Sequence, residues 1–285
     1  MTAKTNYHMH TTFCDGKNTP EEMVQEALAR GFTTIGFSSH SMYPFSSDWH
    51  ISCRDHLAYV KEIKRLKEAY SDKIEIMLGY EADFVEGVCC PIPSQYPDEL
   101  KPEYLIGAVH YVPWSKGYFG VDTFFDKARE QIKRVFNGDV KKAVQEYFAC
   151  EREMLKAGDF QILAHCDLVK IQNSPKAPYP LFNEEESWYR DCIKETADAI
   201  AKSGVCVEIN TGAMARGKLD SPYPSPELLE MLHEKNVPVT LSSDAHSTEH
   251  LDFAFDKAIL LAKKAGYTEF MYFSGGKALM QKFDA

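Results

Sequence analysis

Residues 6–16 read NYHMHTTFCDG and place two histidines, His8 and His10, one residue apart near the start of the chain. Alternate side chains of a β-strand point to the same face, so this pair is predicted to aim two imidazoles at one point. Two such imidazoles suit a divalent metal ion. Asp15 follows after the predicted end of the strand, where it can hold a further ion of the same cluster. Because H-x-H pairs also occur on exposed strands, the metal interpretation depends on further ligands elsewhere.

The size and charge of the chain narrow the class of protein. Its 285 residues, 44% of them hydrophobic, can fill one barrel-sized domain or two smaller ones. No segment has the composition of an interdomain linker, so we expect a single domain over 1–285. The formal net charge of −10 weighs against a nucleic-acid partner and favours a small-molecule substrate.

The chain shows neither an apolar signal segment nor an apolar run close to the roughly 18 residues that a membrane span needs. We therefore expect no membrane partner and a cytoplasmic location. The eight cysteines include no C-x-x-C pair and are scattered through apolar segments, as reduced core thiols are. The sequence leaves the oligomeric state open.

Short apolar runs alternate with amphipathic stretches, a rhythm typical of βα units. The first helix is the best marked, with Thr19 as N-cap, Pro20 at the first position, Glu22 completing a capping box and Gly31 as the stop. After the first strand, which carries the H-x-H pair, further strands are predicted at 33–39, 73–80, 104–109, 160–164, 205–209 and 237–243. Further helices are predicted at 57–69, 123–136, 139–157, 184–203, 225–235 and 251–265, with a weak strand and a helix over 269–283.

The ends of these strands carry the residues that indicate chemistry. In an α/β barrel the reactive groups sit at the carboxyl ends of the strands, because the interior is packed. Six of the ten histidines fall at such ends and are joined by a glutamate and an aspartate: His8, His10, His40, His110, His165, His246, Glu81 and Asp244. One strand-end histidine is more often structural, but the full set predicts a metal site. The other four histidines, His50, His56, His233 and His250, are expected to be structural, although His50, in the loop after the second strand, is in a position to reach over the mouth of this site.

This ordered set of fragments resembles the polymerase and histidinol phosphatase (PHP) superfamily and, within it, the histidinol-phosphate phosphatases. The fragments are HMH at 8–10 with Asp15, GFSSH at 36–40, GYEADF at 79–84, GAVH at 107–110, LAHCD at 163–167, EINT at 208–211 and SDAHS at 243–247. They span nearly the whole chain. Asn6 stands where the family often has aspartate.

The resemblance implies an α/β fold, a distorted (β/α)7 barrel similar to a TIM barrel, that holds three divalent ions. The first ion would be bound by His8, His10, Glu81 and Asp244, the second by Glu81, His110 and His165, and the third by Asp15, His40 and His246. Mixed imidazole and carboxylate ligands suit zinc, manganese or iron.

The activity that the resemblance implies is hydrolysis of L-histidinol phosphate to L-histidinol and phosphate in histidine biosynthesis. Hydroxide bridging two ions would attack the phosphorus in line, and Asp244 or His246 would relay a proton toward the leaving oxygen. Arg216, in the loop after the sixth strand, is predicted to grip the phosphate, and Lys170 is a weaker candidate for the same task. Alternatively, Arg216 is a charged loop residue that is exposed to solvent and does not bind the phosphate.

Several other residues have predicted supporting roles. Asp83 and Asp167 are predicted to orient ligand imidazoles, and Glu208 to be a buried, hydrogen-bonded carboxylate. Five loop residues are candidates either for binding the leaving group or for anchoring their loops: Tyr43, Phe45, Asp48, Trp49 and Trp114. Two rival functions stay open, a PHP-type phosphoesterase acting on phosphotyrosine or nucleotides and a non-catalytic PHP module. A metal-storage function is less favoured, because storage does not need one closed cluster of mixed nitrogen and oxygen ligands.

Overall fold

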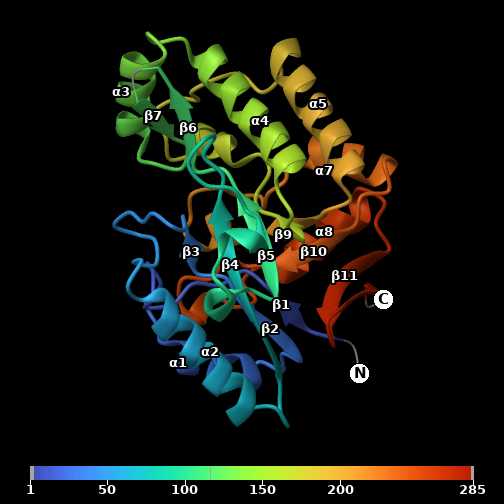
Figure 1. The fold of residues 1–285 in the computed structure, drawn as a ribbon. Coiled ribbons are helices and arrows are strands. Elements are labelled where there is room, and N and C mark those ends of the chain that lie inside the picture. The colour runs from blue at the N-terminus through green and yellow to red at the C-terminus, as the bar shows by residue number, and fades with distance from the viewer. Residues whose placement is uncertain (1–2, 116, 284–285) are drawn as a thin grey trace.

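One parallel sheet forms the centre of the molecule (Figure 1). The computed structural model describes residues 3–115 and 117–283. The strand order is β1 (Thr5–Asn6), β2 (Thr34–Phe37), β4 (Glu75–Asp83), β5 (Tyr104–Ala108), β8 (Ile162–Leu163), β9 (Cys206–Asn210) and β10 (Val239–Ser242), with β3 (His40–Ser41) paired to β4. All of these pairings are parallel. The sheet therefore has the arrangement that the βα rhythm predicts.

The first and last strands of this order meet and nearly close the sheet into a barrel. Met9 forms a parallel bridge with Ala245. The amide of His10 donates to the Ala245 carbonyl at 2.8 Å, and the Ala245 amide donates to the His8 carbonyl at 3.2 Å. The predicted distorted (β/α)7 barrel is confirmed, and the H-x-H pair lies on the seam where the barrel closes.

Helices cover the outside of the sheet, with α1 and α2 on one side and α4, α5 and α7 on another (Figure 1). Their bounds are α1 (Pro20–Ala29), α2 (His56–Ala69), α3 (Phe125–Val135), α4 (Val140–Ala157), α5 (Ser187–Ser203), α6 (Gly212–Ala215), α7 (Pro226–Glu234) and α8 (Phe255–Lys264). The described residues also form the 3-10 turns η1 (Pro93–Gln95), η2 (Asp98–Leu100), η3 (Leu168–Asn173) and η4 (Thr248–His250). The capping box of α1 is present, since the Thr19 amide donates to Glu22 Oε2 at 2.8 Å and the Glu22 amide donates to Thr19 Oγ1 at 3.3 Å.

The structure differs from the sequence prediction in three segments. An antiparallel hairpin of β6 (Tyr111–Trp114) and β7 (Gly117–Gly120) precedes α3, and the short α6 lies in the predicted loop after β9. The helix predicted near the end of the chain is wrong, because β11 (Glu269–Ser274) and β12 (Lys277–Lys282) form a hairpin there. Gly275 and Gly276 both have positive φ, which allows this tight turn.

Apolar side chains fill the end of the barrel opposite the carboxyl ends of the strands. A buried cluster there includes Tyr7, Tyr104, Ile106, Ile162 and Phe273. The Tyr7 hydroxyl donates to the Phe273 carbonyl at 2.8 Å and accepts from its amide at 2.7 Å, which fastens the C-terminal hairpin across this end. Since the floor is packed and apolar, only the carboxyl ends of the strands can present polar groups to a substrate.

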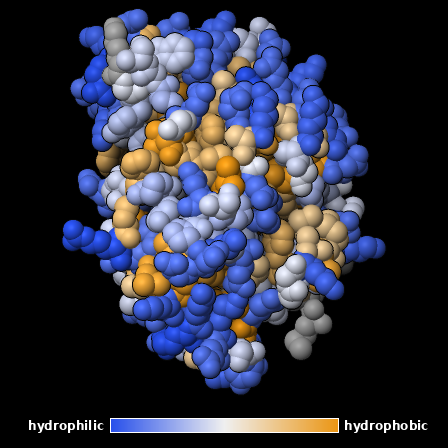
Figure 2. All heavy atoms as spheres, in the orientation of Figure 1, coloured by the Kyte–Doolittle hydropathy of each residue, from blue (hydrophilic) through white to orange (hydrophobic). Residues whose placement is uncertain are grey.

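Hydrophilic residues dominate the face shown in Figure 2, and hydrophobic residues show mainly across its middle. Over residues 3–115 and 117–283, no helix combines the length and the apolar character needed to cross a membrane.

Helix α4 buries one carboxyl group, that of Glu151, which is 1% exposed. The Tyr147 hydroxyl donates to its Oε1 at 2.7 Å, and its Oε2 has no hydrogen-bond partner in the described chain. Burial raises the pKa of Glu151 well above its usual value of 4.5. The folded state therefore binds a proton that the unfolded state releases at neutral pH, and stability decreases as pH rises above about 4.5.

We expect Glu151→Gln to raise Tm relative to the wild type, because the amide needs no proton. The gain should grow between about pH 5 and pH 8, reaching on the order of 5 °C. Thermal unfolding followed by circular dichroism at several pH values measures it. Glu153→Gln, an exposed change on the same helix, should show no pH-dependent difference. A Tm difference for Glu151→Gln that is constant across this range would contradict a protonated carboxyl group.

Candidate active site

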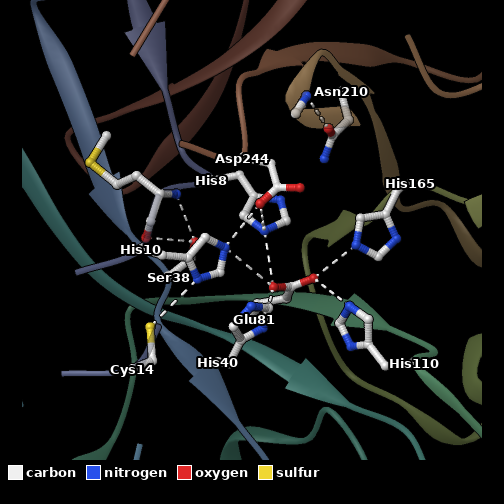
Figure 3. A network of polar contacts seen from close by, with 12 residues as sticks. His8, His10, Cys14, Ser38, His40, Glu81, His110, His165, Asn210 and Asp244 are labelled. Carbon is white, nitrogen blue, oxygen red and sulfur yellow. Dashed lines mark hydrogen bonds and ion pairs between the residues drawn. The ribbon is translucent and has the colours of Figure 1, made fainter. Parts of the chain in front are cut away.

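Glu81 lies at the centre of the strand-end cluster (Figure 3). It stands near the carboxyl end of β4, beside His40 in the parallel register with β3, and is 2% exposed. Its Oε2 is 2.7 Å from His40 Nδ1, 3.1 Å from His8 Nε2 and 3.5 Å from His10 Nε2. One carboxylate oxygen therefore faces three imidazoles that come from the barrel seam and from β3.

The other oxygen of Glu81 faces two more imidazoles. Its Oε1 lies 3.0 Å from His165 Nε2 and 3.4 Å from His110 Nε2 (Figure 3). These two histidines follow the ends of β8 and β5. Glu81 is thus placed between two sets of nitrogen atoms, as a carboxylate that bridges two ions must be.

Two aspartates extend the cluster toward the cavity. Asp244, which has a positive φ of 48°, places Oδ1 3.1 Å from His10 Nε2. Asp15 places Oδ1 3.6 Å from His40 Nε2 and Oδ2 3.2 Å from His246 Nε2. The structure thus brings together all nine of the predicted metal ligands: His8, His10, Asp15, His40, Glu81, His110, His165, Asp244 and His246.

Several buried ligand atoms have no hydrogen-bond partner in the described part of the chain: His8 Nε2, His10 Nε2, His40 Nδ1 and Glu81 Oε2. Buried polar atoms are normally paired, so unpaired atoms grouped in one place need an explanation. Three groups of residues can each hold an ion, because the potential ligand atoms within each group lie within 4.8 Å of one another. The groups are His10, Asp15, His40 and His246; His8, His10 and Glu81; and His40, Glu81 and His110. This donor set fits divalent ions bound through nitrogen and oxygen.

Carboxylates behind the cluster fix the orientation of the ligand rings. Glu208 Oε2 lies 2.8 Å from His8 Nδ1, and Asp83 Oδ1 lies 2.6 Å from His110 Nδ1. With Nδ1 held from behind, the Nε2 atom of each ring points into the cluster. Asp83 Oδ2 also lies 2.5 Å from His50 Nε2, so His50 is buried behind the site and does not cover its mouth.

The carboxylates and imidazoles of the cluster shift one another's pKa values toward their charged forms. Burial would raise the pKa of Glu81, but the imidazoles of His8, His40 and His110 outweigh it and hold that pKa well below the usual range. Burial would lower the pKa of His110, but the Asp83 and Glu81 carboxylates raise it to about 10. Glu81 therefore remains an anion and is available as a ligand.

Two of the predicted supporting residues have other partners. Asp167 does not orient an imidazole, because its Oδ2 accepts from the Ser225 amide at 2.7 Å. Lys170 is buried and does not line the cavity beside the cluster. The 3-10 turn η3 directs it inward, where its Nζ donates to the Pro222 carbonyl at 3.0 Å and lies 3.6 Å from Asp167 Oδ2.

Arg216 lies at the end of α6 and lines the cavity. Its Nη2 donates to Asp244 Oδ2 at 2.9 Å, and its Nη1 donates to the Asp244 carbonyl at 3.2 Å. The guanidinium group therefore holds Asp244 while it faces the cavity. It is not the solvated loop charge that the sequence left open as an alternative.

The cavity beside the cluster has a volume of about 380 Å³. One wall is the ligand cluster, and another comes from the β6–β7 hairpin, the residues after it and the start of α3, which contribute Tyr111, Tyr118, Asp122, Phe124, Lys127 and Gln131. Sequence reasoning missed this wall because it did not predict the hairpin. Of the five loop candidates for the leaving group, Trp49 lines the cavity and its Nε1 donates to the Tyr111 hydroxyl at 2.9 Å.

Known proteins share this fold and this sequence pattern. The model of the PHP domain family matches residues 6–212. The "Probable histidinol-phosphatase" of Deinococcus radiodurans is 25% identical over 273 residues, which cover 93% of this chain and 95% of the relative. The histidinol-phosphatase of Lactococcus lactis subsp. lactis is 27% identical over 276 residues, which cover 96% of both chains.

A solved structure extends this similarity to the fold. The crystal structure of histidinol phosphate phosphatase from Lactococcus lactis subsp. lactis, complexed with zinc, L-histidinol and phosphate, has a TM-score of 0.71 to this chain at 25% identity. The similarity covers 96% of this chain and 98% of that structure.

Proposed function

The chain belongs to the PHP domain family, and we propose that it is a metal-dependent phosphatase that hydrolyses L-histidinol phosphate to L-histidinol and phosphate. The observation that carries the proposal is the buried cluster of imidazole and carboxylate groups at the carboxyl ends of the strands, several of whose atoms have no hydrogen-bond partner in the described chain. The relatives named histidinol-phosphatase match almost the full length of the chain, which supports the choice of substrate.

We propose that the cluster holds three divalent ions, each of them zinc, manganese or iron. The first would be held by His8, His10, Glu81 and Asp244, the second by Glu81, His110 and His165, and the third by Asp15, His40 and His246. Such ions lower the pKa of water and neutralise charge on phosphoryl oxygens. The groups of nearby potential ligand atoms support metal binding in this cluster, and they overlap, since His10, His40 and Glu81 each belong to two of them.

The chain's own residues bind the phosphate and move the proton. Arg216 presents its guanidinium group to the cavity and can donate to phosphoryl oxygens while it holds Asp244. His246 Nδ1 lies 3.0 Å from the Asp244 carbonyl oxygen, 3.2 Å from Arg216 Nη1 and 3.5 Å from Asp244 Oδ1. Asp244 or His246 would relay a proton toward the leaving oxygen. His246 lines the cavity, where the leaving group departs.

Elemental analysis of the purified protein combined with kinetics tests this proposal. We expect bound divalent metal and a kcat/KM for L-histidinol phosphate well above that for phosphotyrosine and nucleotides. A preference for phosphotyrosine or a nucleotide would contradict the substrate assignment. Protein without metal that stays inactive after reconstitution would contradict the metal-dependent mechanism.

We expect Arg216→Ala to lower kcat/KM for L-histidinol phosphate by roughly 10–100-fold, since charge-assisted hydrogen bonds to the phosphate are lost. The KM and the inhibition constant of inorganic phosphate should both rise. Arg65→Ala is the matched control, because Arg65 is an exposed arginine on α2 that pairs with Glu62 and Glu21. If Arg216→Ala leaves the affinity for phosphate unchanged, Arg216 acts only by holding Asp244.

We further propose that residues 1–285 act as one domain and that the protein works in the cytoplasm. All eight cysteines are free, including the buried Cys89, Cys166, Cys192 and Cys206, which agrees with a reducing compartment.

A further inference from the structure

Asp122 is a cavity carboxylate outside the proposed ion cluster. In the described chain, three carboxylates line the cavity: Asp15, Asp122 and Asp244. Asp15 and Asp244 face imidazoles of the cluster at 3.1–3.6 Å. Asp122 comes from the other wall, between the end of β7 and the start of α3. The described lining of the cavity thus includes one carboxylate that is not among the proposed ligands.

No hydrogen bond or ion pair to the Asp122 carboxylate occurs within residues 3–115 and 117–283, and the residue is exposed. It is nevertheless close enough to act on charges across the cavity. Burial lowers the pKa of Lys218, and the Asp122 carboxylate counters that decrease. The Asp122 carboxylate is therefore free to contact a group that binds in the cavity.

The described lining of the cavity includes three basic residues, Lys127, Arg216 and Lys218. Arg216 Nη2 donates to Asp244 Oδ2 of the cluster at 2.9 Å, so the phosphate would bind near Arg216. A second pocket of about 180 Å³ adjoins the cavity and shares Asp122, Thr123, Phe124, Ile171 and Lys218 with it. Asp122 thus lies at the junction between the phosphate end and this extension.

The extension suits the rest of the leaving group. Beyond the shared residues it is lined by Phe125, Gln172, Ser174, Lys176, Ala177 and Pro178. Phe124 is 84% exposed, so its ring is available to stack on a planar group. A substrate with phosphate at the cluster would place the atoms next to its ester oxygen beside Asp122.

We propose that Asp122 is the specificity-determining residue that binds an ammonium group close to the ester oxygen and so selects cationic phosphomonoesters. The inference rests on the proposed function, because L-histidinol phosphate carries its amine on the carbon next to the ester-bearing carbon. An ammonium group pairs with Asp122, the phosphate pairs with Arg216 and Lys218, and the imidazole extends toward Phe124. Charged hydrogen bonds are the strong ones, so this pair can discriminate among substrates.

A double-mutant cycle between enzyme and substrate tests this assignment. The wild type and Asp122→Asn are compared on L-histidinol phosphate and on 3-(imidazol-4-yl)propyl phosphate, which lacks only the amine. At about pH 8 the imidazole of both substrates is mostly neutral, while the aliphatic amine stays largely protonated. We expect Asp122→Asn to lower kcat/KM for L-histidinol phosphate by roughly 10–100-fold, mainly through KM. The effect on the analogue should stay within about threefold.

Asp126→Asn is the matched control, because Asp126 is an exposed acid in the first turn of α3 that does not line the cavity. It should leave both substrates unaffected. The inhibition constant of the product L-histidinol should rise in Asp122→Asn, and that of inorganic phosphate should not.

Equal losses on both substrates in Asp122→Asn would overturn the assignment, since Asp122 would then act through the structure of the wall. A wild type that does not distinguish the substrates would overturn it as well. A wild type that hydrolyses neither substrate but does hydrolyse another phosphomonoester would overturn the proposed function, and this inference with it.

Discussion

Glu81→Gln is expected to lower kcat/KM for L-histidinol phosphate by at least about a thousandfold and to reduce the metal content of the protein. The two oxygens of Glu81 face five imidazoles, those of His8, His10, His40, His110 and His165. The amide of glutamine has no charge to balance metal ions, and its NH2 group cannot act as a ligand. Elemental analysis and steady-state kinetics on the same preparations measure both effects.

Glu75→Gln is the matched control because Glu75 begins the strand that Glu81 nearly ends. Its carboxylate accepts from Ser274 Oγ at 2.6 Å and from the Gly275 amide at 2.7 Å, at the packed end of the barrel. We expect this variant to keep its metal and its activity and to lose a little stability, since that end of a barrel serves stability. If Glu81→Gln kept full metal content and activity, Glu81 would not be a shared ligand.

Residue order along the chain was enough to predict the cluster, because parallel strands bring their carboxyl ends to one place. His110 and His165 are 55 positions apart in the sequence, yet both follow strands of one sheet and face the same oxygen of Glu81. The same periodicity, by which side chains two apart on a strand share a face, predicted that Asp83, two positions after Glu81, orients an imidazole, and the structure shows it 2.6 Å from His110 Nδ1. The parallel prediction for Asp167 is wrong. These inferences depend only on backbone periodicity.

The cavity wall that the β6–β7 hairpin and the start of α3 form could not be predicted in this way. The β6 strand contains Pro113 and β7 begins at Gly117, and both residue types are uncommon in strands, so the hairpin has the composition of a loop. Asp122 follows no strand of the barrel and reaches the cavity only because this hairpin folds over it. Lys170 was predicted as a phosphate contact but does not line the cavity. The direction of its side chain depends on a 3-10 turn that periodicity does not predict.

Asp15→Asn is expected to remove one of the three proposed ions and to lower kcat/KM by roughly 100–1000-fold. Asp15 faces His40 at 3.6 Å and His246 at 3.2 Å and makes no close contact with Glu81 among the described residues. The loss should therefore be confined to the third ion, and elemental analysis should find about two ions per chain.

The matched control is Asp48→Asn, because Asp48 is an exposed acid in the loop before Trp49 that does not line the cavity. It should keep three ions per chain and full activity. Added zinc or manganese should restore part of the activity of Asp15→Asn only at concentrations far above those that saturate the wild type, because His40 and His246 remain as ligands. An Asp15→Asn protein that still holds three ions would show that this carboxylate is not a ligand. One that loses every ion would show that the third ion is not independent of the other two.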